Sequence, residues 1–408
     1  MEMKILFATI SAVPNIGEHT ISLDLLRELQ SKGHEIYILC ALERREKMQT
    51  YLAEEMNCQI LRVKIGNNKK ANLIEKGITT LMLPQIYIAA IKKFFSDVKF
   101  DLVLYPTPPV THAKTAAFIK KRDGARTYLL LKDIFPQNSV DIGMMQKRGI
   151  KGLIYRHFRR QEKKLYALSD RIGCMSQANV EYLLKHNPEI DPAKVEICPN
   201  AIAVRDMSVD AGVRAELREK YEIPQDKKVF IYGGNLGRPQ GIPFLIQCLE
   251  RQKANPDAYF LIVGDGTEYQ KLEAWFAEAK PANAKLVKRL PKEDYDRLVA
   301  ACDVGMIFLD HRFTIPNFPS RLLSYLQAKL PVLCCTDPNT DIGKVCTEGG
   351  FGFACESNDP AGFNAQIRMA LEADLPAMGE AGFDYLNQHY TAEKACNIVL
   401  QNDMVSVV

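Results

Sequence analysis

The chain has 408 residues, which is long enough for two domains of ordinary size. Hydrophobic residues make up 47% of it and charged residues 25%, a composition typical of a globular protein with a sizeable core. The formal net charge of +4 is too small to indicate a nucleic-acid partner, and none is expected.

The sequence predicts neither a membrane span nor a metal centre. Residues 1–10 form a strand-like apolar run without the features of a secretory signal. The longest apolar helix candidate, 78–91, is interrupted by Pro84 and is too short to cross a bilayer. The eleven cysteines are scattered without metal-ligand spacing, which indicates reduced thiols in a cytoplasmic protein.

Strand-like and helix-like segments alternate along the first half of the chain. A helix is predicted over 18–32, with Ile21, Leu25 and Leu29 on one face and Gly33 at its end. Strands are predicted at 4–10, 35–39, 59–63, 101–105, 127–131 and 171–175. This alternation favours a parallel sheet covered by helices on both faces.

The pattern breaks over 199–213, which is predicted to be a linker, and then resumes. Strands are predicted at 229–232, 259–263, 284–287, 304–309 and 332–334. The sequence therefore predicts an α/β protein with two Rossmann-like domains, 1–203 and 204–384, facing a central cleft. In open α/β sheets, ligands bind outside the carboxyl ends of the strands, so both domains should present those ends to the cleft.

The most informative motif is the glycine-dense turn 232–241, with the sequence YGGNLGRPQG. A strand enters it, and a helix opens at about 242–243, where a proline suits the first turn. Glycines let a ligand approach the backbone, and a helix start carries partial positive charge, so the turn predicts a phosphate site. An ordinary strand-to-helix turn is the alternative. Neither a dinucleotide-type G-x-G-x-x-G nor a Walker loop is present.

A second candidate anion site lies in residues 317–325. Ser320 is predicted to be the N-cap of a helix, and Arg321 places a cation in its first turn. A cation there opposes the helix dipole, and a bound anion would relieve that conflict. A surface arginine at a normal helix start is the alternative.

Four further positions are candidates for contacts with substrates. Gly264 closes a strand, and Gly17 precedes the first helix. Asp133 follows a buried strand and should face the cleft, while His112 begins a helix. The alternatives are a tight turn for Gly264, a helix-capping carboxylate for Asp133 and a structural histidine at 112.

The segment 144–172 is strongly basic. Its only acidic residues are Glu162 and Asp170, and apolar side chains such as Leu153 and Phe158 interleave with its cations. Basic amphipathic stretches often lie on anionic membrane surfaces, so residues 147–171 are a candidate membrane contact. A solvated helix face is the alternative.

Taken together, these motifs resemble the family 4 retaining glycosyltransferases of the GT-B fold over essentially the whole chain. The stretches that carry the resemblance are Gly17, 32–35 (KGHE), 195–200, 234–241, 261–266, 290–304, 326–332 and 350–354. The tail 383–392 is similar to the closing helices of that family. The resemblance therefore implies that the helices of about 385–408 pack back on the first domain.

Several residues depart from the family pattern. Asn235 and Gln240 stand where the family has the arginine and lysine that hold the donor diphosphate. Pro316 and Ser324 replace the paired glutamates, and Lys329 stands at a usual glycine.

Residues 133–143 (DIFPQNSVDIG) resemble one branch of the family, whose members are similar to enzymes that add N-acetylfucosamine-type sugars to bacterial surface polysaccharides. The resemblance implies a nucleotide diphospho-sugar donor, expected to be UDP-linked, and a polyprenyl-diphosphate-linked or glycan acceptor. Transfer is expected to retain configuration without a cofactor or metal, at the cytoplasmic membrane face.

The resemblance also implies roles for individual residues. Arg238 and Arg321 are expected to stabilise the diphosphate, and Asp133 to accept the proton of the acceptor hydroxyl. The donor-binding candidates are Gly17, Gly234, Asn235, Gln240, Gly264, Ser320 and Ser324. The acceptor-side candidates are His112 and Asn138.

Two other functions remain open. The missing glutamates are compatible with a non-catalytic subunit that supports a partner glycosyltransferase. A sugar-nucleotide 2-epimerase shares the architecture, but it would be expected to cluster histidines and carboxylates in the cleft, and the seven histidines here show no clustering.

Overall fold

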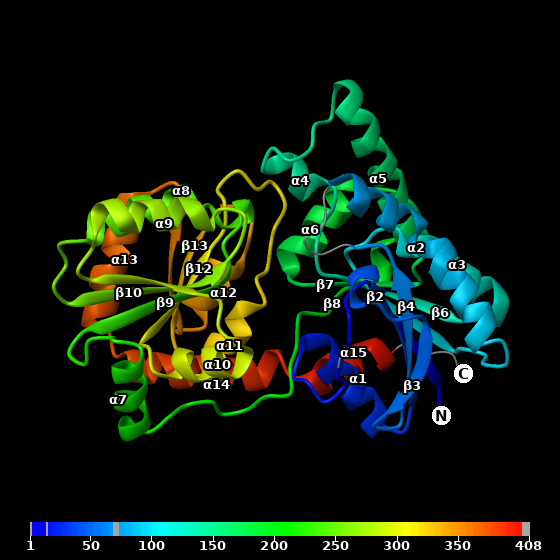
Figure 1. Ribbon diagram of the computed structural model, residues 1–408, viewed down its shortest axis with the longest axis horizontal. Helices are drawn as coiled ribbons and strands as arrows, with labels where there is room; N and C mark the ends of the chain where they lie inside the picture. The colour runs from blue at the N-terminus through cyan, green and yellow to red at the C-terminus, as the bar shows by residue number, and fades with distance from the viewer. Residues whose placement is uncertain (1, 14, 68–72, 402–408) are drawn as a thin grey trace. The chain divides into compact units, whose positions relative to one another are not determined.

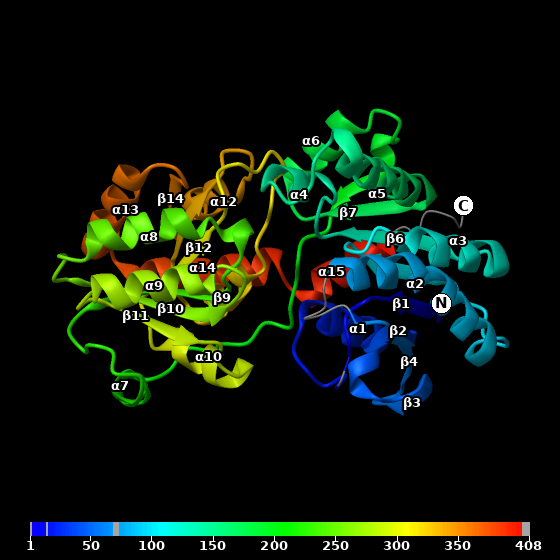
Figure 2. The same ribbon diagram turned by 45° about the horizontal axis from the view of Figure 1, so that its top comes forward.

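The computed structural model describes residues 2–13, 15–67 and 73–401, and the chain divides into two compact units. Unit 1 comprises Met1–Ala203 and Ala392–Val408, and unit 2 comprises Val204–Thr391. Each unit is a mostly parallel sheet covered by helices (Figures 1 and 2), which confirms the predicted pair of Rossmann-like domains. Residues 385–391, expected with the first domain, belong to unit 2.

The sheet of unit 1 has eight strands in the order β3-β4-β2-β1-β5-β6-β7-β8. Only β3 runs antiparallel, against β4. The bounds are β1 Lys4–Ala8, β2 Glu35–Glu43, β3 Tyr51–Glu55, β4 Cys58–Ile65, β5 Leu102–Pro106, β6 Arg126–Leu131, β7 Arg171–Cys174 and β8 Val195–Ile197. All six predicted strands are present, whereas β3 and β8 were not predicted.

The helices of unit 1 are α1 Ile21–Ser31, α2 Leu73–Phe94, α3 His112–Asp123, α4 Gln137–Asp141, α5 Gly149–Leu168, α6 Gln177–His186 and α15 Ala392–Leu400, with short 3-10 turns η1 Arg44–Glu46 and η2 Pro192–Lys194. α1 begins after Thr20, whose Oγ1 accepts the N–H of Leu23 at 3.2 Å. α2 continues through Pro84, so the predicted interruption is wrong. Packing of the buried Leu83, Tyr87 and Ile91 outweighs the local cost of the proline. Across the described ranges, no helix is long and apolar enough to cross a membrane.

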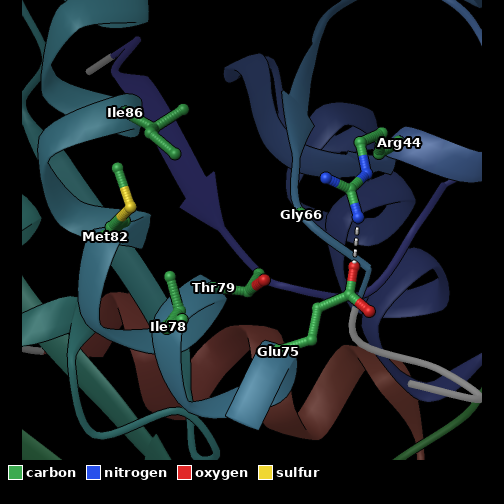
Figure 3. A pocket seen from close by; sticks show the side chains of 7 residues that line it. All are labelled: Arg44, Gly66, Glu75, Ile78, Thr79, Met82 and Ile86. Atoms are coloured by element: carbon green, nitrogen blue, oxygen red, sulfur yellow. Dashed lines mark hydrogen bonds and ion pairs between the residues drawn. The ribbon is translucent and has the colours of Figure 1, made fainter. Parts of the chain in front are cut away.

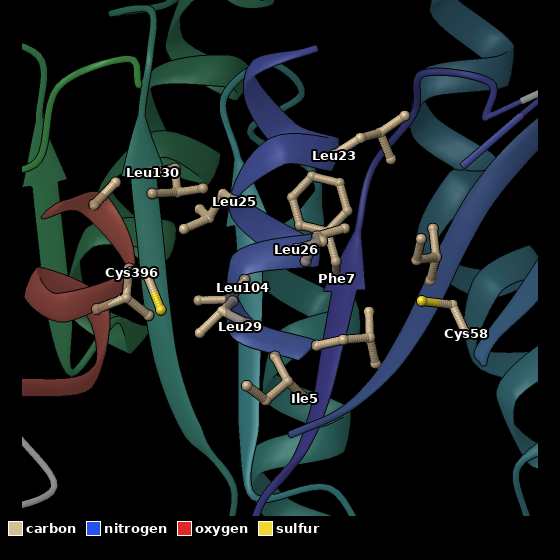
Figure 4. Close-up of a cluster of buried hydrophobic side chains, with 14 of the residues drawn as sticks. Ile5, Phe7, Leu23, Leu25, Leu26, Leu29, Cys58, Leu104, Leu130 and Cys396 are labelled. Atoms are coloured by element: carbon tan, nitrogen blue, oxygen red, sulfur yellow. The ribbon is translucent and has the colours of Figure 1, made fainter. Parts of the chain in front are cut away.

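The core of unit 1 forms where α1 packs on the sheet (Figure 4). Leu25, Leu26 and Leu29 of α1 are buried in one apolar cluster with Phe7 of β1. Cys396 of α15 belongs to the same cluster. The helix that follows unit 2 in sequence therefore completes the core that the first helix begins.

The sheet of unit 2 has six parallel strands in the order β11-β10-β9-β12-β13-β14. The strands are β9 Lys228–Asn235, β10 Ala258–Asp265, β11 Ala284–Lys288, β12 Val304–Phe308, β13 Val332–Thr336 and β14 Gly352–Glu356. The five predicted strands are present, and β14 was not predicted.

The helices of unit 2 are α7 Ala211–Lys220, α8 Ile242–Gln252, α9 Tyr269–Ala279, α10 Lys292–Ala300, α11 Arg321–Gln327, α12 Ile342–Glu348, α13 Pro360–Glu372 and α14 Leu375–His389, with the 3-10 turn η3 Arg238–Gln240. α8, α9 and α13 cover one face of the sheet, and α10, α11 and α14 cover the other (Figure 1). The last three residues of the predicted linker 199–213 begin α7.

Candidate functional site

The glycine-dense turn of unit 2 has the strand-to-helix geometry that the sequence predicts. β9 ends at Asn235, η3 follows, and α8 begins at Ile242 directly after Gly241. Gly234 has φ +121°, a backbone conformation that residues other than glycine rarely adopt. The backbone at Gly234 therefore takes a path that requires glycine and leaves one side of the turn open to a neighbouring side chain.

Arg321, the first residue of α11, occupies that side. Its guanidinium carbon lies 4.4 Å from the ring centroid of Tyr232. Its Nη2 is 3.5 Å from the position that a Cβ on Gly234 would take. Its Nη1 is buried and has no hydrogen-bond partner among the residues that the structure describes. The two candidate anion sites predicted in unit 2 therefore meet at one place, with one guanidinium nitrogen unused.

Tyr325 fixes the backbone beneath this guanidinium, and sequence reasoning missed it. Its hydroxyl donates to the carbonyl of Met306 at 3.1 Å and accepts the N–H of Gly233 at 3.3 Å. Tyr232 was also missed as a partner of Arg321. Only its position directly before Gly233 in the turn could have signalled its role.

Arg238 is placed differently from Arg321. Its side chain is 54% exposed, and its Nε lies 3.7 Å from a carboxylate oxygen of Glu268, which also pairs with Lys271. The single cation of the glycine turn is therefore partly compensated by a carboxylate of its own unit.

The two amides that replace the cations of the turn contact each other. Asn235 Nδ2 donates to Gln240 Oε1 at 2.9 Å, and the N–H of Gly237 donates to the same oxygen at 3.1 Å. Gly264 has a packing role, because a Cβ there would lie 2.0 Å from the carbonyl oxygen of Gly234. These three candidate residues hold the shape of the turn.

Ser320 occupies the predicted N-cap position of α11, but its side chain does not cap the helix. Ser320 has helical dihedrals (φ −67°, ψ −14°), and its side chain makes no capping hydrogen bond. α11 has only seven residues, so the charge at its start is small. Ser324 lies three residues after Arg321, on the same side of α11. The positive charge at this end of α11 therefore comes from Arg321 itself.

Asp133 of unit 1 lies two residues after β6, at the carboxyl end of the sheet as predicted. Asn138 Nδ2 donates to both of its carboxylate oxygens, at 2.8 and 2.9 Å. Burial raises the pKa of Asp133 to about 6, although the hydrogen bonds from Asn138 lower it. The alternative interpretation made Asp133 a helix-capping residue. The next helix, α4, instead has Pro136 at its N-cap position, so Asp133 does not cap it.

His112 is enclosed within unit 1. Its side chain is 1% exposed, it stacks on Tyr87 with ring centroids 6.1 Å apart, and neither ring nitrogen has a partner among the described residues. Burial lowers its pKa to about 4, so the ring is neutral at pH 7. The structural alternative fits His112 better than the predicted acceptor-side role. Gly17 lies in the loop before α1, where its N–H donates to Asn15 Oδ1 at 2.8 Å.

The basic segment 147–171 includes α5, which exposes both apolar and cationic side chains. Leu153 and Ile154 are 58% and 51% exposed, beside the exposed cations Arg156 and Arg160. Arg159 instead pairs with Glu162 and donates to Asn187 Oδ1, so its charge is used in contacts within unit 1.

An apolar pocket of about 500 Å³ lies between α2 and the end of β4 (Figure 3). Ile78, Met82 and Ile86 of α2 line it. On its other side Arg44 Nη2 donates to Glu75 Oε1 at 2.7 Å. None of the predicted site residues lines this pocket.

Comparisons with known proteins identify both halves of the chain. The model of Glycosyltransferase Family 4 matches residues 17–206, and the model of Glycosyl transferases group 1 matches residues 213–382. WbjE of Pseudomonas aeruginosa, named as a probable glycosyltransferase, is 27% identical over 330 residues, 80% of each chain. WcaI of Escherichia coli, named as a colanic acid biosynthesis glycosyl transferase, is 24% identical over 391 residues, 90% of this chain and 92% of its own.

A solved structure supports the same fold. Anabaena HepE, in complex with UDP and glucose, matches 99% of this chain and 100% of its own with a TM-score of 0.69, at 13% sequence identity. The predicted GT-B fold is thus confirmed. The chain is a glycosyltransferase, whose residues 17–206 match the model of Glycosyltransferase Family 4 and whose residues 213–382 match that of Glycosyl transferases group 1.

Proposed function

We propose that this glycosyltransferase moves an N-acetylfucosamine-type sugar from a UDP-linked donor to a polyprenyl-diphosphate-linked or glycan acceptor, with retention and without a metal, in bacterial surface polysaccharide assembly. The name of WcaI refers to colanic acid biosynthesis, and HepE binds UDP and glucose in its solved complex. Both names support a sugar nucleotide as donor and a polysaccharide pathway.

The observation that carries the proposal is the unused guanidinium nitrogen of Arg321 beside Gly234. When the bond between sugar and diphosphate breaks, negative charge grows on the departing diphosphate. A donor group already aimed at that charge lowers the barrier, typically by about 10²–10³ in rate. Arg321 is held in place by Tyr232, so little reorganisation is needed when the charge develops.

Asp133 is proposed as the group that accepts the proton of the acceptor hydroxyl. With a pKa of about 6 it is mostly ionised at neutral pH and still basic enough to take a proton. The two hydrogen bonds from Asn138 fix the plane of the carboxylate. Ser324 is proposed to contact the ribose of the donor.

The exposed Leu153 and Ile154, flanked by cations of α5, support a peripheral contact with an anionic membrane at its cytoplasmic face. Such a contact would bring the enzyme to a lipid-linked acceptor.

The donor is tested by thermal shift and product release with UDP-, GDP- and dTDP-sugars. Binding to the native state alone stabilises it by about 2.7 kcal/mol at a hundredfold excess over Kd. We expect UDP-sugars to stabilise the wild type, Arg321→Ala to lose most of that shift, and Arg297→Ala, an exposed arginine on α10, to keep it. An equal shift in Arg321→Ala would contradict the proposal.

The second candidate function is a non-catalytic subunit. Pro316 and Ser324 leave unit 2 without the paired glutamates of the family pattern, which favours this alternative. Nucleotide binding without release of nucleoside diphosphate, for every sugar and acceptor tested, would support it.

A further inference from the structure

A second pocket, of about 430 Å³, lies wholly within unit 1. Its lining comes from the carboxyl ends of β1 and β5, from Lys132 just after β6, and from the first turn of α1. In the sheet, β2 to β4 lie on one side of β1, and β5 to β8 lie on the other. The strand order therefore changes direction at β1. Open α/β sheets bind ligands at such a switch point.

Lys132 is the unusual residue of this pocket. Its Nζ makes no hydrogen bond or ion pair with any residue in the described part of the chain. Burial lowers its pKa to about 8, so it still carries its charge at pH 7. Lys132 is half-buried, and a cation partly removed from water without a counter-ion loses hydration free energy, which a bound anion would offset.

The other lining groups suit an oxyanion that also accepts hydrogen bonds. Ser11 and Ser22 bring hydroxyls to the pocket, and Thr20 stands at the start of α1. α1 has eleven residues, so its first N–H groups add partial positive charge to the same pocket. Glu18 is the one acidic residue of the lining, and its side chain is exposed.

We propose that this pocket binds a phosphate group of the acceptor, with Lys132 as its counter-ion. The inference rests on the proposed function and adds to it a site for an acceptor that carries phosphate. The groups proposed to hold the donor diphosphate, Arg321 and Gly234, belong to unit 2, whereas the Lys132 pocket is lined by residues of unit 1 alone.

Calorimetric titration of the full chain with farnesyl phosphate, farnesol and UDP tests the proposal. Farnesyl phosphate should bind at least about tenfold more tightly than farnesol, since a charge-assisted contact contributes about that much. Lys132→Met should remove this preference and leave UDP binding unchanged. Lys114→Met, which removes an exposed lysine of α3, should change neither.

A pH series with Lys132→Arg keeps the test decisive if Lys132→Met fails to fold. Wild-type affinity for farnesyl phosphate should fall as pH rises past about 8, because the lysine loses its proton, whereas the arginine variant should keep its affinity. Equal binding of farnesyl phosphate and farnesol to the wild type would overturn the proposal. Loss of UDP affinity in Lys132→Met would overturn it too, by assigning the lysine to the donor. The affinities for farnesyl phosphate and for UDP are both measured without sugar transfer. If the protein transferred no sugar from any donor, the proposed function would be refuted, but the phosphate site at Lys132 would not.

Discussion

The two arginines near the glycine turn of unit 2 carry the same charge in opposite settings. Arg321 lies on the ring of Tyr232 with an unused buried nitrogen, and Arg238 is half exposed beside Glu268. A side chain held by an aromatic ring loses little freedom when it binds an anion, whereas an exposed one must be ordered and must leave its carboxylate. Nothing in the sequence ranks one arginine above the other, and the environment of each side chain places Arg321 first.

The largest expected effect tests this ranking directly. Arg321→Ala should reduce the rate of transfer by about 10²–10³, because it removes the preorganised charge. Arg238→Ala should reduce the rate of transfer by about tenfold or less. The charge of Arg238 is already screened by solvent and partly compensated by Glu268, so it stabilises a developing negative charge less. Steady-state rates of nucleoside diphosphate release measure both, with circular dichroism as the control for folding. A larger loss in Arg238→Ala than in Arg321→Ala would contradict this ranking.

A second comparison sets the titrating carboxylate of unit 1 against the permanently charged Arg321. Activity should rise as pH passes about 6, because Asp133 must lose its proton before it can act as a base. Asn138→Ala removes two hydrogen bonds that stabilise the carboxylate, so the pKa of Asp133 rises and this limb of the pH–rate profile moves to higher pH. Asp133→Asn should lower kcat by about 10²–10⁴ with UDP binding retained. An unshifted profile in Asn138→Ala would remove Asp133 from the reaction.

A third prediction concerns stability. The pKa of Lys132 is lowered in the folded state, so the unfolded chain binds its proton more tightly. Wild-type stability should therefore increase as pH rises from about 8 towards 10.5. Lys132→Met should melt at a higher temperature than the wild type at pH 7, and the difference should shrink across that range. A lower melting temperature for Lys132→Met at pH 7 would show that the lysine is stabilising.

The smallest expected effect is at the membrane. Leu153→Ser with Ile154→Ser should reduce flotation with anionic vesicles at least several-fold, since burial of even one methylene contributes about 0.8 kcal/mol. Met369→Ser, which removes an exposed apolar side chain from α13 of unit 2, is the matched control. Equal flotation of the wild type with neutral and anionic vesicles would rule out the contact.

Much of the fold could be predicted because buried parallel strands are short apolar runs, such as Leu102–Pro106. β3 (YLAEE) was missed because it is an exposed edge strand with no such run. Pro84 was given too much weight, since the packing of α2 on β4 and α3 is not visible in a local window. Long-range contacts decide helix continuity there.

The site was predicted less completely, for a related reason. The sequence could locate Gly234 and Asp133 near the carboxyl ends of strands and Arg321 in the first turn of a helix, because these positions follow from the order of elements. It could not show that the ring of Tyr232 would contact Arg321, which lies 89 residues further along the chain. Nor could it show that His112 would be buried. Side-chain burial depends on which distant elements pack together, and Lys132 was overlooked for that reason.

The packing of α15 on α1 has a consequence for biosynthesis. A ribosome makes the chain from its amino end, so all of unit 2 is synthesised between the first helix of unit 1 and the helix that covers it. Leu25 and Leu29 would lack their last partner on the nascent chain until Cys396 emerges. Unit 2 is contiguous and can fold first, while a fragment limited to residues 1–203 would be prone to aggregate unless the α15 sequence were grafted onto it.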